Sequence, residues 1–321
     1  MKARYIIARL LLLTLAGCSP HKIITKPDFK IKVPDTDIVF NTIETPQKDE
    51  LFGKEVLGFY SIGMDSIEYI DTGRNLITPF FVGNGILVAM DKQGNPGSIQ
   101  PFFGRLVFLS NGQYRYCTSR SEASGWYVHS YSGNVLIENE GDIKIIDVNT
   151  CEVMGTIITN DEIQEMEAGS SISTFDLSDD GEILLLSLMD HKIVHVNLPG
   201  RIIYSYGLLG KYPVMSPDEK QFAFLGPDGI HVVDIEGMND RLLIGCGLNS
   251  SMGENCFNRG NEPKPQWSKD GKKLVYHKCN ASSLNCSDIR EYDIYIYDLK
   301  TDQEQLIIHG GLNPSWNYFK D

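Results

Sequence analysis

The chain has 321 residues, of which 42% are hydrophobic and 22% are charged, as is ordinary for a folded globular protein. Its length suits one large domain or two small ones. The net charge of −13 argues against a nucleic-acid partner, because neutralising phosphates requires an excess of lysine and arginine.

The N-terminal residues form a targeting segment. Basic residues precede a short apolar run: Lys2, Arg4, Arg9 and 10–15. The run is far shorter than the ~20 residues of a membrane-spanning helix. The order Leu15-Ala16-Gly17-Cys18 then resembles the lipobox of bacterial lipoproteins. The alternative is an ordinary signal peptide with a coincidental cysteine.

The lipobox resemblance implies a signal peptide over residues 1–17 and a lipid, palmitate included, on Cys18. It also implies a membrane-anchored protein of the bacterial cell envelope. Ser19 after the cysteine implies the outer membrane, with the protein facing the periplasm. Removing residues 1–17 removes three basic residues and no acidic one, so the mature net charge is −16.

Six cysteines remain besides Cys18: Cys117, Cys151, Cys246, Cys256, Cys279 and Cys286. An even number in an exported protein predicts disulfides. Short spacing favours the pairs Cys246–Cys256 and Cys279–Cys286, which leaves Cys117–Cys151 by elimination. The spacing does not match that of structural zinc ligands, so we expect neither a metal nor a cofactor.

Residues 18–36 mix lysine and proline without a helical period and predict a tether. From Asp37 onward, short β-like runs alternate with turn signals. The predicted strands are 37–40, 56–60, 66–70, 86–90, 105–110, 127–130, 134–138 and 142–148. The acidic stretch 160–167 predicts one or two helical turns with Asn160 as the N-cap.

The second half of the chain repeats one pattern of turn and strands. In Ser216-Pro217-Asp218-Glu219-Lys220, proline fixes φ and aspartate bonds its own backbone. Related turns begin at Ser178 and Ser268, and a partial copy begins at Asn313. A single such sheet cannot bury both faces, whereas copies stacked about an axis can. The period of ~40–50 residues therefore predicts a β-propeller, with a β-sandwich as the rival fold.

These repeats resemble the WD40-like TolB repeat of TolB-like β-propellers. The resemblance covers 213–237, 265–299 and 314–316, and more loosely 175–198. It implies an all-β domain over residues 37–321, with six blades of four-stranded antiparallel sheets. The last copy stops one strand into a blade, so we expect the strand near 37–40 to pair with the C-terminal strand and close the ring. Peptidases with such propellers carry a hydrolase domain, and its Gly-x-Ser-x-Gly elbow is missing here.

Two cysteine-bearing insertions, 245–262 and 278–292, interrupt the repeats. Extra loops on one face of a repeat fold often build its binding surface. The binding-loop candidates are Asn258, Arg259, Asn261 and Asn285. The alternative is stapled loops without a binding role. His191 and His195 read as ordinary strand positions, because residues i and i+4 of a strand lie ~13 Å apart and cannot share a metal.

The sequence thus predicts a lipid-anchored, non-enzymatic propeller that serves as a platform for an envelope protein partner. The alternatives are a small-ligand or glycan binder, or a hydrolase or lyase that uses the central axis, since fold does not determine function. His, Asp and Glu converging from different blades would favour an enzyme, and an apolar rim would favour a protein partner.

Overall fold

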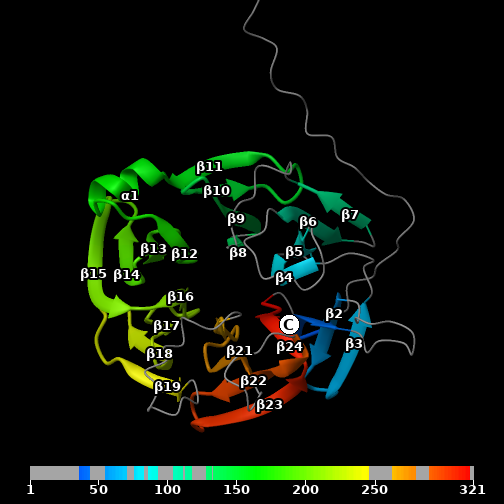
Figure 1. Cartoon of the computed structure of the whole chain (residues 1–321). Coiled ribbons are helices and arrows are strands. Elements are labelled where there is room, and N and C mark those ends of the chain that lie inside the picture. Colours follow the sequence, from blue (N-terminus) through cyan, green and yellow to red (C-terminus); the bar gives the residue numbers. More distant parts are fainter. Residues whose placement is uncertain are drawn as a thin grey trace, which may run out of the picture.

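The structure, a computed structural model, describes residues 36–43, 55–70, 76–82, 86–92, 104–110, 113–117, 128–131, 133–245, 262–279 and 289–318. Their strands form six four-stranded antiparallel sheets. Figure 1 shows these sheets as the blades of a closed ring, with β4, β8, β12, β16 and β24 nearest its centre. The chain is therefore an all-β, six-bladed propeller, as the repeats predicted.

The first three blades, each given from the inner strand outward, come mostly from the first half of the chain. Blade I contains β24 (Gly311–Trp316), β1 (Ile38–Ile43), β2 (Glu55–Ser61) and β3 (Ser66–Ile70). Blade II contains β4 (Leu76–Val82), β5 (Ile86–Lys92), β6 (Gly104–Ser110) and β7 (Gln113–Tyr116). Blade III contains β8 (Val128–Tyr131), β9 (Asn134–Asn139), β10 (Asp142–Ile146) and β11 (Val153–Ile158).

The other three blades follow in chain order. Blade IV contains β12 (Ile172–Leu177), β13 (Ile183–Leu188), β14 (Lys192–Asn197) and β15 (Ile202–Leu209). Blade V contains β16 (Lys211–Met215), β17 (Gln221–Leu225), β18 (Gly229–Asp234) and β19 (Arg241–Gly245). Blade VI contains β20 (Gln266–Trp267), β21 (Lys273–Cys279), β22 (Tyr292–Asp298) and β23 (Gln303–His309).

The ring closes through its two ends, as predicted. In blade I, the C-terminal strand β24 is the inner strand and pairs antiparallel with β1. Ile38 lies opposite Trp316, and Val39 lies opposite Ser315. Side chains from the first and last blades then share one buried cluster that includes Phe40, Trp316 and Ile294. Strand pairing and apolar burial therefore both join the ends of the chain.

The repeated turn has the local chemistry that the sequence predicted. The hydroxyl of Ser216 donates to Asp218 Oδ1 at 2.7 Å, and Ser178 and Ser268 make the same bond to Asp180 and Asp270. The serine bond is the main reason that the pKa values of Asp180 and Asp218 are lowered. These carboxylates therefore build turns.

Three inner strands carry the same irregularity near their beginning. Thr78, Tyr212 and Asn313 have φ values of 49°, 53° and 49°, each directly before a proline, at a shift in the strand register. The backbone N–H of each donates to a polar side chain of the preceding blade: Asn41 Oδ1 (3.0 Å), Thr174 Oγ1 (3.0 Å) and His277 Nδ1 (3.3 Å) respectively. The following proline has no N–H. The shift in register therefore leaves few backbone donors of the strand without a hydrogen bond.

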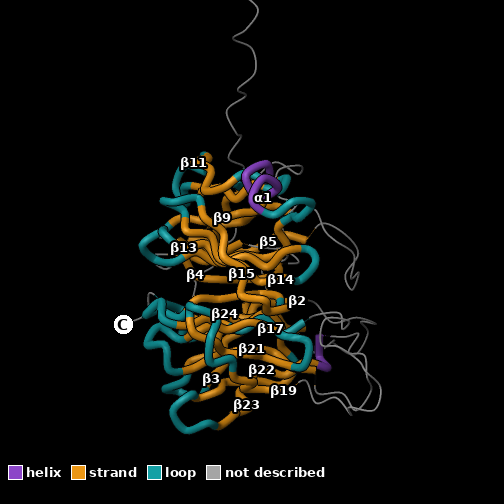
Figure 2. The backbone as a smooth tube through the Cα atoms, turned by 90° about the vertical axis from the view of Figure 1, so that its left-hand side faces the viewer, coloured by secondary structure: helices purple, strands orange, loops and turns teal. Residues whose placement is uncertain are grey.

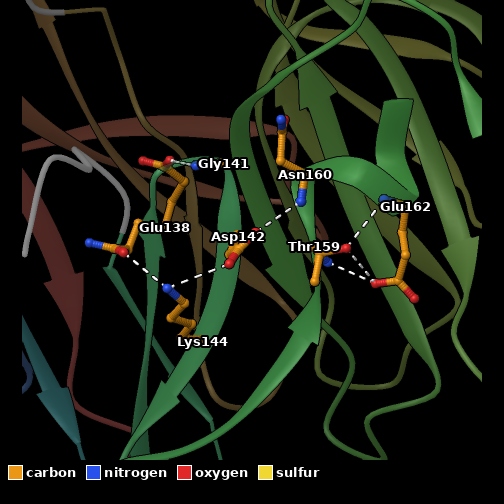
Figure 3. Close-up of polar contacts among 8 residues, drawn as sticks. Glu138, Gly141, Asp142, Lys144, Thr159, Asn160 and Glu162 are labelled. Carbon is orange, nitrogen blue, oxygen red and sulfur yellow. Dashed lines mark hydrogen bonds and ion pairs between the residues drawn. The ribbon is translucent and has the colours of Figure 1, made fainter. Parts of the chain in front are cut away.

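The helix between blades III and IV begins one residue earlier than predicted. In α1 (Asn160–Met166) the N-cap is Thr159 and not Asn160. Thr159 Oγ1 accepts from the N–H of Glu162, whose carboxylate accepts from the N–H of Thr159, as Figure 3 shows. Asn160 instead donates its backbone N–H to Asp142. The sequence signal for this reciprocal cap was the order Thr-x-x-Glu. Within the described residues, no helix is both long and apolar enough to cross a membrane.

One disulfide joins neighbouring blades. Cys117, just after β7 of blade II, is bonded to Cys151, in the turn between β10 and β11 of blade III, and their Cα atoms lie 4.9 Å apart. This is the predicted pair that remained once the closely spaced cysteines were assigned to each other. Cys279 at the end of β21 is also disulfide-bonded.

Candidate functional site

All inner strands begin at the same face of the ring, called here the entry face. The ends of neighbouring inner strands meet at the opposite face: Trp267 Nε1 donates to the carbonyl of Val214 (2.9 Å), and Trp316 Nε1 donates to that of Gln266 (3.1 Å). Because strands alternate in direction within a blade, their connections alternate between the two faces. In the side view of Figure 2, the strands run between these faces.

The long connections leave one face only. Between the described strands, every connection on the opposite face has at most six residues. The connections on the entry face include all the longer ones: 44–54, 93–103, 117–127, 159–171, 246–265 and 280–291. Both predicted cysteine-bearing insertions are among them. Long loops on one face of a repeat fold commonly carry its function.

The predicted site residues within these insertions lie outside the described residues: Cys246, Cys256, Cys286, Asn258, Arg259, Asn261 and Asn285. Cys18 lies outside them as well. The structure does place the strands that flank the insertions. Gly245 ends the outer strand of blade V, and Cys279 ends the second strand of the adjacent blade VI. The flanks therefore belong to neighbouring blades at one face.

A partly buried charged cluster lies at this face and is made of His191, Lys211, Tyr212, Glu262 and Lys264. Glu262 Oε1 accepts from Lys211 Nζ at 2.6 Å, and Glu262 Oε2 accepts from the Tyr212 hydroxyl at 2.8 Å. The side chains of Lys211 and Glu262 are only 15% and 11% exposed. Lys211 begins the inner strand of blade V, and Glu262 precedes that of blade VI. The contact therefore joins two blades near the axis.

Tyr212 is held from two sides. Its N–H donates to Thr174 of blade IV, and its hydroxyl donates to Glu262. Its ring therefore has a defined position, and Lys264 Nζ lies 5.1 Å from the ring centre, within the range of a cation–π contact.

Two groups of the cluster have shifted pKa values. Burial lowers the pKa of Lys264 to about 8, against the opposing attraction of Glu262. Burial also lowers the pKa of His191, and the charge of Lys211 lowers it further. His191 belongs to the turn between β13 and β14, at φ 69°, so blades IV, V and VI all contribute. Perturbed titrating groups that converge from several elements are typical of functional sites, although structural ion pairs also produce them.

The sequence did not single out Lys211, Tyr212, Glu262 or Lys264, because no motif or spacing unites them. Its one signal was that Glu262 ends the first predicted insertion. His191 lies in the turn before β14, and His195 lies in β14 and contacts the Tyr206 hydroxyl through Nδ1. In the part of the chain that the structure describes, no group of three or more His, Cys, Asp or Glu side chains is placed to hold a metal.

Comparisons with known proteins support the fold. No protein-family model matches the sequence, and no curated protein matches it. A chain of a nidogen/laminin complex has a TM-score of 0.56 at 9% identity, covering 87% of this chain and 97% of that one. A putative TolB from Agrobacterium tumefaciens has 0.51 at 13%, covering 81% and 92%. An oligogalacturonate lyase in complex with manganese has 0.46 at 14%, covering 84% and 73%. The TolB-like resemblance is thus confirmed at the level of the fold.

Proposed function

We propose that this chain is an exported β-propeller of the bacterial cell envelope that binds a protein partner through its entry face and catalyses no reaction. A lipid on Cys18 anchors it, residues 1–17 are its signal peptide, and residues 18–36 are its tether. The proposal places it in the outer membrane, facing the periplasm. The sequence order Leu15-Ala16-Gly17-Cys18 supports the anchor.

The observation that carries the binding role is the confinement of every long connection to the entry face. A propeller with no binding role has no reason to keep its long connections on one face, so we would expect connections of similar length on both faces. Six long connections around one axis can present a composite surface, whereas the short turns of the opposite face are occupied by their own hydrogen bonds.

The point at which the chain enters the ring agrees with this role. Thr36 precedes β1, and its carbonyl oxygen accepts from Asn317 Nδ2, just past the end of β24. The tether therefore joins the domain at the opposite face. A tether over residues 18–36 spans at most ~68 Å when extended, and it leaves the domain from the opposite face. The entry face then remains accessible to a partner, and the mature charge of −16 favours a partner with a basic surface.

Site-specific photocrosslinking in intact cells tests the binding role. A photoreactive residue replaces the exposed residues Glu140 or Met189 on the entry face, and Lys220 or Thr301 on the opposite face as matched controls. We expect a discrete crosslinked protein from the first pair only. Equal capture from both faces, or no capture from the entry face, would overturn the proposal.

The anchor has a separate test. Cys18→Ser should abolish incorporation of radiolabelled palmitate and should release the protein from the membrane fraction. Cys117→Ser serves as the control, because it removes a cysteine that lies within the propeller. Undiminished labelling of the Cys18→Ser variant would contradict lipid attachment at this residue.

A further inference from the structure

We propose that the outer edge of blade I rests on a zwitterionic lipid surface through four side chains, those of Ile62, Met64, Ile67 and Tyr69, called here the blade I patch. The inference rests on the lipid anchor at Cys18 proposed above, because that anchor is what brings the domain to a bilayer. It adds a contact that the folded domain makes by itself.

The blade I patch is exposed although its side chains are apolar or aromatic. Ile62 and Met64 lie in the turn between β2 and β3, and the side chain of Met64 is 74% exposed. Ile67 and Tyr69 lie two residues apart in β3, so they share one face of that strand. Figure 1 shows β3 at the outer edge of its blade. Large apolar side chains grouped in this way mark an interaction surface more often than single ones do.

The turn between β2 and β3 is held in one shape. The N–H of Ile62 donates to Asp37 Oδ2 at 2.8 Å, and the Tyr60 hydroxyl donates to Asp65 Oδ1 at 2.8 Å. A Cβ atom added to Gly63 would meet no other atom within 4 Å, so the turn projects into open space. Because the turn is already ordered, its apolar side chains can enter a lipid surface without a large loss of conformational entropy.

The place at which the tether joins the domain favours a bilayer as the occupant of the patch. Asp37, which accepts the bond from Ile62, directly follows Thr36, the last residue of the tether. An anchor on Cys18 therefore acts on the domain beside the patch. A tether also gives the two surfaces it joins a high effective concentration, so a weak contact between them is populated. A protein free in solution has no such advantage at this place.

The charge of blade I decides the kind of lipid. Its described residues, 36–43, 55–70 and 311–316, include Asp37, Glu55, Asp65 and Glu68 but no lysine or arginine. An anionic lipid surface attracts basic segments, whereas it repels carboxylates. A zwitterionic surface does not repel them, and it accepts apolar side chains. Tyr69 suits such a surface, because tyrosine combines an apolar ring with a polar hydroxyl and gathers at membrane–water interfaces.

The experiment uses the full-length lipidated protein in phosphatidylcholine vesicles that contain nitroxide-labelled lipid. A fluorescent amino acid replaces Met64 or, as the matched control, Met189, which is 65% exposed on the entry face. We expect the vesicles to quench the probe at position 64 at least about twofold, because interfacial side chains lie ~5–10 Å deep in the bilayer. We expect no quenching at position 189. Replacing phosphatidylcholine by phosphatidylglycerol should weaken the quenching at position 64.

A second variant tests the rest of the patch. Tyr69→Asp, in the protein with the probe at position 64, should reduce the quenching, because it places a charge where the tyrosine would enter the lipid surface. Tyr204→Asp is the matched control, since Tyr204 is an exposed tyrosine in the outer strand of blade IV. It should leave the quenching unchanged. Unfolding midpoints verify that both variants fold.

Flotation with the vesicles reports the anchor separately. A protein that floats without quenching at position 64 keeps its anchor and overturns the contact, and a protein that does not float contradicts the anchor. Equal quenching at positions 64 and 189, or quenching that Tyr69→Asp does not change, would also overturn the contact. So would a probe at position 64 that leaves water without being quenched by the lipid, because a second copy or another protein would then cover the patch.

Discussion

The side-chain amide of Asn317 donates a hydrogen bond to the carbonyl oxygen of Thr36 at 3.0 Å, across 281 residues of sequence. The N–H of Asn317 also donates to the carbonyl of Asp37 at 2.8 Å. The next residue, Tyr318, donates its hydroxyl to the carbonyl of Trp267 in blade VI. These C-terminal residues therefore hold both the first strand of the domain and the last blade.

Deleting the residues after Leu312 should abolish cooperative folding. The deletion removes most of β24, exposes Phe40 and Ile38 of the shared apolar cluster, and opens the ring. Thermal unfolding followed by circular dichroism measures the effect. The milder variant Asn317→Ala should unfold cooperatively, with a loss of about 1 kcal/mol for its bond to Thr36. A sharp transition in the truncated protein would show that closure does not depend on β24.

Replacing both Cys117 and Cys151 by serine should destabilise the protein by about 4 kcal/mol. The bond spans 34 residues, and its loss restores the conformational entropy of that loop in the unfolded chain. Urea unfolding under oxidising conditions measures the difference. With a reductant present, the natural protein and the variant should become equal. Equal midpoints under oxidising conditions would contradict a stabilising role.

Thr159→Ala should destabilise the protein by about 1 kcal/mol, because it removes the acceptor for the N–H of Glu162. Asn160→Ala is the matched control. Asn160 makes its contact to Asp142 through the backbone N–H, which alanine retains. We expect the control to stay within about 0.5 kcal/mol of the natural protein. Urea unfolding compares the two, and the reverse order of losses would place the cap at Asn160.

The stability of the natural protein relative to Lys264→Met should rise with pH between about 8 and 10.5. In the folded state the pKa of Lys264 is about 8, below the ordinary value of 10.5. Between these values the unfolded chain binds the extra proton, so raising the pH favours the folded state. At pH 7 both states are protonated, and the folded state bears the full cost of the buried ammonium. Urea unfolding at pH 7 and 10 measures this, and a constant difference between the proteins would contradict the shift.

One strand was not predicted, because its local sequence argues against a strand that the contacts in the folded protein allow. The strand β4 was not predicted, since Pro79 interrupts Leu76–Val82 and proline usually excludes a central strand. The structure places Pro79 directly after the bulge at Thr78, whose N–H donates to Asn41 of the neighbouring blade. In addition, β4 is the inner edge strand of blade II, and an edge strand tolerates a proline that a central strand would not.

The local sequence was enough to predict the blade-building turn. Ser216 and Asp218 are only two residues apart, and their side chains bond in any context that permits the turn. The repetition of that turn was enough to predict a propeller, because a single sheet of this kind cannot bury both of its faces and stacked copies can. The pairing of Lys211 with Glu262 was decided by tertiary structure alone. Those residues lie 51 positions apart and carry no shared motif, and only the stacking of blade V on blade VI brings their charges together out of water.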